Sequence, residues 1–140
     1  MTTVFTNGVF DLLQVGHVRL LQFARAQGDH LIVAINSDAS AARVKGSDRP
    51  VVPAHERAEV LRALRCVDDV QIFDDDTPEP LIQRLRPLVL VKRPACRETD
   101  IPGAAFVESI GGPVVIPDWP VAHSSTQLVG RIIRTVGAIG

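Results

Sequence analysis

Residues 3–17 read TVFTNGVFDLLQVGH and join two different apolar patterns. The β-branched and aromatic residues at 3–6 predict a strand, which the turn signal Asn7-Gly8 brings to an end. From about residue 17 to residue 27 the apolar residues recur at helical spacing, and Gly28 favours a C-terminal cap at the end of this helix. The chain is therefore expected to begin with a strand, a glycine-containing loop and a helix.

Short apolar runs and amphipathic segments continue to alternate along the rest of the chain. Strands are expected over 31–35, 67–73, 88–91 and 114–116. Helices are expected over 54–65, from Asp76 or Thr77 to Leu85, and from Ser124 or Ser125 to about residue 136. Turn-forming residues fill 37–53, which predicts a long loop, with a short helix over 39–44 as the alternative to continuous loop.

This alternation predicts an α/β fold with a single domain that spans residues 1–140. The expected architecture is a Rossmann-like five-stranded parallel sheet with helices on both faces and right-handed crossovers. Ligands in such folds bind beyond the carboxyl ends of the strands. The segments expected there are 7–17, 36–53, the residues from Lys92 onward, and the entry into the final helix.

Composition excludes several classes of function. Fifteen basic and sixteen acidic residues give a net charge of −1, and neither half of the chain forms a basic arm, so we expect no nucleic-acid or membrane partner. No apolar run approaches the ~18 residues of a membrane span. The first residues lack the features of a signal peptide, and Cys66 and Cys96 lack metal-ligand spacing, so we expect a cytoplasmic protein without a metal site of its own.

The basic residues are strongly biased in type. Thirteen of the fifteen are arginine, and the only lysines are Lys45 and Lys92. A lysine presents a compact point charge that suits a phosphate, so both lysines are candidates for phosphate binding. The alternative is that lysine occurs at these two positions by chance.

The helix that follows the first loop has a polar start. Gly8 and Gly16 allow a ligand to approach the backbone closely, and Gly16-His17 falls where free amides and the positive end of the helix dipole attract phosphate. His17 can donate to a phosphate oxygen there and stabilise charge that develops in the transition state. The alternative is that His17 is a surface cap or a packing residue.

The loop resembles the signature of the cytidylyltransferase-like nucleotidyltransferases, G-x-F-D-x-x-H-x-G-H. Residues 8–17 match it at each defined position except the first histidine, which is Gln14. The resemblance extends through nearly the whole chain, in the segments 34–38, 44–46, 49–50, 56–61, 91–92 and 123–126. Within the family the chain is most similar to the bacterial D-glycero-D-manno-heptose-1-phosphate adenylyltransferases, which occur alone or as the second half of a bifunctional enzyme of ADP-heptose synthesis.

The resemblance implies a nucleotidyltransferase that moves AMP from ATP to a sugar 1-phosphate and releases pyrophosphate. It implies a Mg²⁺ ion that the ATP phosphates hold, and a homodimer. His17, Lys45, Gln14 and Lys92 are the implied catalytic residues. The nucleotide is expected to contact Asn7, Gly8, Val9, Phe10, Gly16, His17, Lys92, Ser124, Ser125 and Thr126. The substrate side is expected to involve Asp11, Lys45 and Arg57, and for Asp11 orientation of the loop is favoured over metal ligation.

The chain departs from the family pattern in three places. Gln14 is a neutral amide in place of a histidine, which can carry a positive charge. Arg93-Pro94 follows Lys92, where the heptose enzymes have two glycines. Residues 118–122 replace the usual approach to the final helix, and Trp119 there either stacks on a base or belongs to the core or to an interface. Two alternatives therefore stay open: a glycerol-3-phosphate cytidylyltransferase-like enzyme, and a nucleotide-binding homologue with weakened catalysis.

Overall fold

A computed structural model of the chain describes residues 1–94, 101–120 and 125–139. Its strands are β1 (Thr3–Gly8), β2 (His30–Asn36), β3 (Asp69–Phe73), β4 (Val89–Val91) and β5 (Val114–Val115). Its helices are α1 (Val15–Arg25), α2 (Asp38–Lys45), α3 (Ala54–Arg62), α4 (Glu79–Leu85), α5 (Ala104–Ser109) and α6 (Ser125–Ile139). The five strands form one sheet in the order β3-β2-β1-β4-β5, and each pair is parallel. The predicted α/β fold is confirmed.

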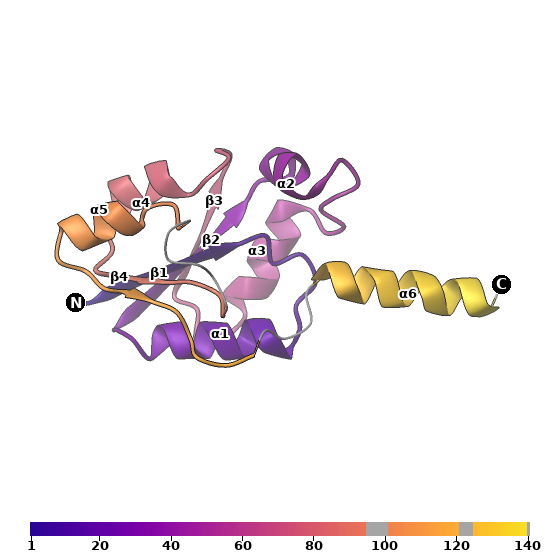
Figure 1. The fold of residues 1–140 in the computed structure, drawn as a ribbon, viewed down its shortest axis with the longest axis horizontal. Coiled ribbons are helices and arrows are strands. Elements are labelled where there is room, and N and C mark those ends of the chain that lie inside the picture. The colour runs from indigo at the N-terminus through magenta and orange to yellow at the C-terminus, as the bar shows by residue number, and fades with distance from the viewer. Residues whose placement is uncertain (95–100, 121–124, 140) are drawn as a thin grey trace.

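Helices cover both faces of the sheet (Figure 1). Successive residues of β1 point to opposite faces, so Val4 packs with α1 and α3 while Phe5 packs with α4 and α5. Both side chains are fully buried. Strands that are buried on both faces explain the continuous apolar run over residues 31–35 in the sequence.

The parallel arrangement brings several loops to one edge of the sheet. β1 and β2 pair in register from Thr3 with His30 to Gly8 with Ile35, and β4 lies on the other side of β1. The loop after β1, the segment after β2 and the residues after β4 therefore leave the sheet side by side. The helix α6 begins beside this edge and projects away from the rest of the molecule (Figure 1).

Most element boundaries are close to those expected. The short helix over 39–44 exists as α2, whereas β3 begins at Asp69 and the final helix continues to Ile139. Pro78 is the N-cap of α4, and the Thr77 hydroxyl accepts a hydrogen bond of 3.4 Å from the Glu79 amide. Asp76 does not cap this helix, because its carboxylate pairs with Arg43.

Two expectations about local structure are wrong. Gly28 does not cap α1, because the C-cap is Ala26 in a right-handed helical conformation. Gly28 is required for close packing instead, since a Cβ there would lie 2.7 Å from the backbone oxygen of Thr2 and 2.7 Å from a methyl of Val4. The helix α5 is not predicted from the sequence, because its six residues are too few to show a helical period.

None of the helices in the described ranges combines the length and the apolar composition that a membrane crossing requires.

Candidate active site

Lys92 lies at the junction of β1 and β4. It directly follows β4, and its ammonium donates a hydrogen bond to the Asn7 side-chain oxygen on β1. The Lys92 backbone amide also donates to the Val115 oxygen of β5 at 3.0 Å, and the residue is only 8% exposed. These contacts fix a positive charge at the carboxyl edge of the sheet, beside the loop that follows β1.

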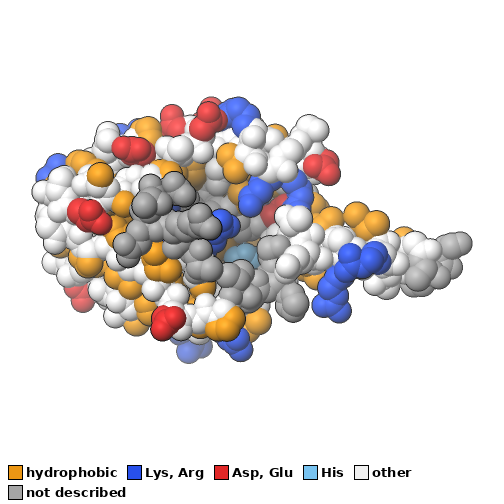
Figure 2. Space-filling model, in the orientation of Figure 1, with side chains coloured by type: hydrophobic (Ala, Val, Ile, Leu, Met, Phe, Trp, Pro, Cys, Tyr) orange, Lys and Arg blue, Asp and Glu red, His pale blue; other side chains and the backbone are white. Residues whose placement is uncertain are grey.

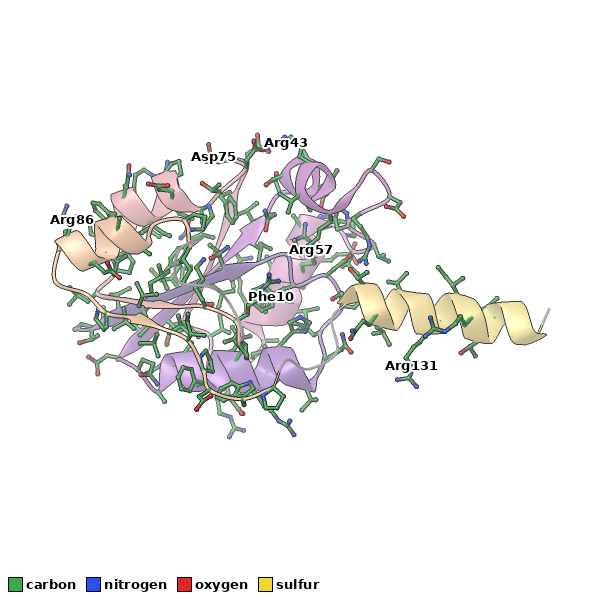
Figure 3. The ribbon with its side chains drawn as sticks, viewed as in Figure 1. Phe10, Arg43, Arg57, Asp75, Arg86 and Arg131 are labelled. Atoms are coloured by element: carbon green, nitrogen blue, oxygen red, sulfur yellow. The ribbon has the colours of Figure 1, made fainter. Side chains whose placement is uncertain are left out.

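The Phe10 ring supports that loop from inside. Phe10 adopts a left-handed backbone conformation with φ of 51°, which brings its buried ring back over Gly8. A Cβ on Gly8 would lie 3.0 Å from this ring, so glycine is the residue that fits. The same ring packs against the His17 imidazole, with centroids 5.5 Å apart (Figure 3 labels Phe10). The loop is thus folded around an internal aromatic contact.

His17 is held as a neutral hydrogen-bond donor. The Gln14 backbone amide donates to His17 Nδ1 at 3.0 Å, so the ring carries its proton on Nε2. Burial lowers the pKa of His17 from its ordinary value of 6.5. At neutral pH the imidazole therefore offers one N–H at the start of α1, where a phosphate oxygen is favoured by the helix dipole.

Gln14, which replaces the motif histidine, is the N-cap of α1. Its side-chain amide nitrogen is buried and has no hydrogen-bond partner in the part of the chain that the structure describes. A buried donor without an acceptor costs free energy, so this nitrogen is suited to an acceptor on a bound ligand.

The Asp11 carboxylate ties the loop after β1 to the segment after α2. It accepts hydrogen bonds from the Val51 amide at 2.9 Å and the Val52 amide at 2.9 Å, and it pairs with Arg49 at 3.1 Å. Its side chain is 2% exposed, compared with 11% for Arg49. These contacts hold the loop against the segment after α2 and already engage both carboxylate oxygens, while a role of Asp11 on the substrate side stays a prediction.

Arg57 links the same segments from α3 (Figure 3). Its guanidinium donates to the Val9 oxygen at 2.8 Å, the Val52 oxygen at 2.8 Å and the Asp38 carboxylate at 2.9 Å. The residue is 2% exposed. These contacts give Arg57 a role in positioning the loops, while contact with a substrate stays a prediction.

The start of α6 completes the site. Ser125 Oγ accepts from the Leu12 amide and donates to the Leu12 oxygen, both at 3.1 Å. Thr126 Oγ1 accepts from Arg49 at 2.9 Å. Ser125 and Thr126 are therefore attached to the two loops that Asp11 joins. Ser124, which is also a predicted phosphate contact, lies outside the described residues.

Positive charge gathers at this edge. Burial lowers the pKa of Lys45, and the nearby positive charges of Arg93 and Arg49 lower it further. Arg49 is compensated by Asp11, whereas Lys45 and Arg93 make no ion pair with any residue that the structure describes. Figure 2 shows blue side chains and a pale blue histidine around a hollow on this side of the molecule. The site is suited to an anion.

The structure thus brings together most of the residues that the sequence analysis selected, and it adds others. Asn7, Gly8, Phe10, Asp11, Gln14, His17, Arg57, Lys92, Ser125 and Thr126 are linked by the contacts above. Arg49 and Asp38 were not selected as site residues. Both lie in the segment 36–53, which was expected at the ligand-binding edge. Their partners, Asp11 for Arg49 and Arg57 for Asp38, are distant in sequence, so no local pattern indicates these contacts. Trp119 packs edge-on against Phe23 of α1, with ring centroids 5.1 Å apart, and both side chains are half-buried.

Comparison with known proteins agrees with this geometry. A family model described as cytidylyltransferase-like matches residues 5–133. The chain belongs to the cytidylyltransferase-like family. Membership supports a nucleotidyltransferase, and a site that is suited to an anion fits that class of enzyme.

Relatives and solved structures extend this result. The "Bifunctional protein HldE" of Geobacter metallireducens is 48% identical over 134 residues, which cover 96% of this chain and 27% of that protein. The protein of the same name from Streptomyces coelicolor is 50% identical over 130 residues, or 93% of this chain and 28% of the relative. The chain therefore spans little more than a quarter of the length of these relatives. A crystal structure of the lipopolysaccharide core biosynthesis protein from Thermoplasma volcanium has the same fold, with a TM-score of 0.68 at 24% identity over 83% of this chain and 93% of that one.

Proposed function

We propose that the chain transfers AMP from ATP to a sugar 1-phosphate of the heptose type and releases pyrophosphate. The observation that carries this proposal is the convergence of four segments on one cationic site with a neutral His17 donor. The identity of 48–50% to proteins named bifunctional protein HldE supports the heptose class of substrate.

In the proposed reaction a phosphate oxygen of the sugar 1-phosphate attacks the α-phosphorus of ATP. A P–O bond forms to the sugar phosphate, the bond between the α-phosphorus and the bridging oxygen breaks, and the electron pair leaves with pyrophosphate. The attacking phosphate is already ionised, so the reaction needs neither a strong base nor a covalent intermediate. Catalysis therefore depends on positioning and on neutralisation of charge.

Each residue has a distinct task in this proposal. His17 donates from Nε2 to the α- or β-phosphate, and the Gln14 amide donates beside it. Lys45 binds the sugar phosphate or bridges it to ATP, while Lys92 supports the nucleotide. Gly8, Val9 and Phe10 lie along the nucleotide through their backbone, together with Asn7 and Gly16. Ser124, Ser125 and Thr126 hold the β- and γ-phosphates.

We propose that Mg²⁺ enters this site together with ATP. No group of three or more histidine, cysteine or carboxylate ligands occurs among the residues whose placement is described, and the Asp11 carboxylate is already engaged. Mg²⁺ commonly retains water and few protein ligands, so phosphate oxygens would hold it. The ion would supply neutralisation of the phosphate charge.

A second candidate function rests on Gln14. A neutral amide in place of an ionisable imidazole supports binding better than turnover, so a nucleotide-binding homologue with weakened catalysis is the alternative. A cytidylyltransferase acting on glycerol 3-phosphate is the alternative within the enzyme class.

Two measurements separate these candidates. We expect calorimetric titration to give saturable ATP binding, and we expect pyrophosphate release when ATP and a heptose 1-phosphate are both present. Binding without release for every sugar phosphate offered would reject the enzyme proposal. Release that CTP supports better than ATP would favour the cytidylyltransferase.

A further inference from the structure

Arg93 follows Lys92 at a position where the heptose adenylyltransferases that this chain resembles have glycine. It lies between Lys92 and Pro94, which are both buried, while Arg93 itself is exposed. The Lys92 amide is bonded to Val115 and the proline ring restricts the residue before it to extended backbone, so the base of the Arg93 side chain is fixed. The Arg93 side chain is thus exposed at the carboxyl edge of the sheet.

Arg93 and Lys45 each stand next to a residue that is tied to β1 or to the loop after it. Lys92, beside Arg93, donates to Asn7 of β1. Lys45 is the last residue of α2, and Arg49, whose amide donates to the Gly46 oxygen at 3.1 Å, pairs with Asp11. The pKa of Lys45 is lowered first by partial burial and then by the nearby charge of Arg93. Arg49 also contributes to this effect, but its charge is compensated by Asp11. Within the described ranges no carboxylate forms an ion pair with either Lys45 or Arg93. Two cations that repel each other across a site are stabilised when an anion binds between them.

The chemistry of the pair indicates which anion. A guanidinium binds phosphate oxygens in a two-pronged geometry, and an ammonium adds a compact point charge. The neutral Gln14 removes an ionisable group from the start of α1, and Arg93 adds a permanent charge after β4.

We propose that Arg93 and Lys45 together bind the phosphate group of the incoming sugar phosphate, which makes Arg93 a substrate-binding residue of this chain. The inference rests on the proposed function for the identity of the substrate. Binding of a phosphate anion by the pair does not depend on that function and can be tested separately.

The test compares Arg93→Ala with Arg84→Ala, a matched loss of an exposed arginine on α4. Pyrophosphate release is measured with saturating ATP and varied heptose 1-phosphate, and ATP affinity is measured by calorimetry. We expect R93A to raise KM for the sugar phosphate about 10-fold, as loss of one charge-assisted contact implies, and to leave the ATP Kd within about twofold. R93K should recover part of the loss, and R84A should behave like the unchanged protein.

The remaining outcomes are also decisive. An unchanged KM in R93A would overturn the proposal, and so would a raised ATP Kd with the sugar-phosphate KM unchanged, because the residue would then bind the nucleotide. If the unchanged protein releases no pyrophosphate, the proposed function fails, and inorganic phosphate becomes the probe. Weaker phosphate binding in R93A than in R84A would then support the two-cation site, and equal binding would reject it.

Discussion

Replacement of Asp11 by asparagine should destabilise the protein more than the loss of any exposed ion pair. The carboxylate accepts two backbone amides, from Val51 and Val52, and pairs with Arg49 at 3.1 Å. In D11N one oxygen can still accept the amides, but an NH₂ group then faces the guanidinium. Arg49 is left almost buried without its partner, since its side chain is only 11% exposed.

The size of the effect follows from these contacts. A hydrogen bond to a charged group contributes about 1.5–3 kcal/mol, and an unpaired buried donor adds its own penalty. We therefore expect D11N to lower the free energy of unfolding by about 2–3 kcal/mol. With a urea m-value of about 1–3 kcal/mol/M, the unfolding midpoint should fall by roughly 1–2 M. Fluorescence of Trp119, the single tryptophan, reports the transition.

The matched control is Asp76→Asn, which breaks the Arg43–Asp76 pair at the surface. These side chains are 47% and 75% exposed, so the midpoint should not move measurably. In an Arg49→Gln background the effect of D11N should shrink, because the pair is already broken. If D11N unfolds at the same urea concentration as D76N, then the link between the two loops does not stabilise the fold as we infer.

Three further results are expected. Gln14→His should raise the rate of pyrophosphate release about 10-fold or more, because an imidazole can carry charge beside the phosphates; a fall in rate would instead indicate a site built around the amide. The rate of pyrophosphate release should begin to fall only below pH 6.5, because burial lowers the pKa of folded His17 from that value. A rate of pyrophosphate release that declines already above pH 6.5 would contradict the neutral donor. The free energy of unfolding follows the same group: the unfolded chain binds this proton at a higher pH than the folded chain does, so the stability that His17 contributes is full above pH 6.5 and is lost as the pH falls toward the folded pKa. Light scattering should show a dimer, because Ile132 and Ile133 of α6 are 50% and 66% exposed, and Ile132→Asp should yield monomer; a monomeric unchanged protein would refute this expectation.

The sequence predicts the fold well because its main signals are local. The apolar runs of β1 and β2 and the amphipathic α3 have periods that a short window reveals, and their order in the chain implies a parallel sheet. The signature loop and its helix start are also local, so the position of His17 at the start of α1 could be predicted, whereas its contacts with Phe10 and with the Gln14 amide were not.

What the sequence could not predict depends on partners that are distant in the chain. Asp11 meets Val51 and Val52 across 40 and 41 positions, and Arg57 meets Val9 across 48. No periodicity reports such contacts. Gly28 was wrongly expected to cap α1 for the same reason. It is glycine because Thr2 and Val4, which are distant in sequence, approach it closely in space, and its backbone conformation does not require it.

The central claim is that these loops form a pocket for a polyphosphate, and a crystal structure with ATP and Mg²⁺ tests it most directly. We predict the triphosphate within hydrogen-bonding distance of His17 Nε2, with its outer phosphates against Ser125 and Thr126 at the start of α6. ATP bound elsewhere, or phosphates that contact neither His17 nor α6, would contradict the account.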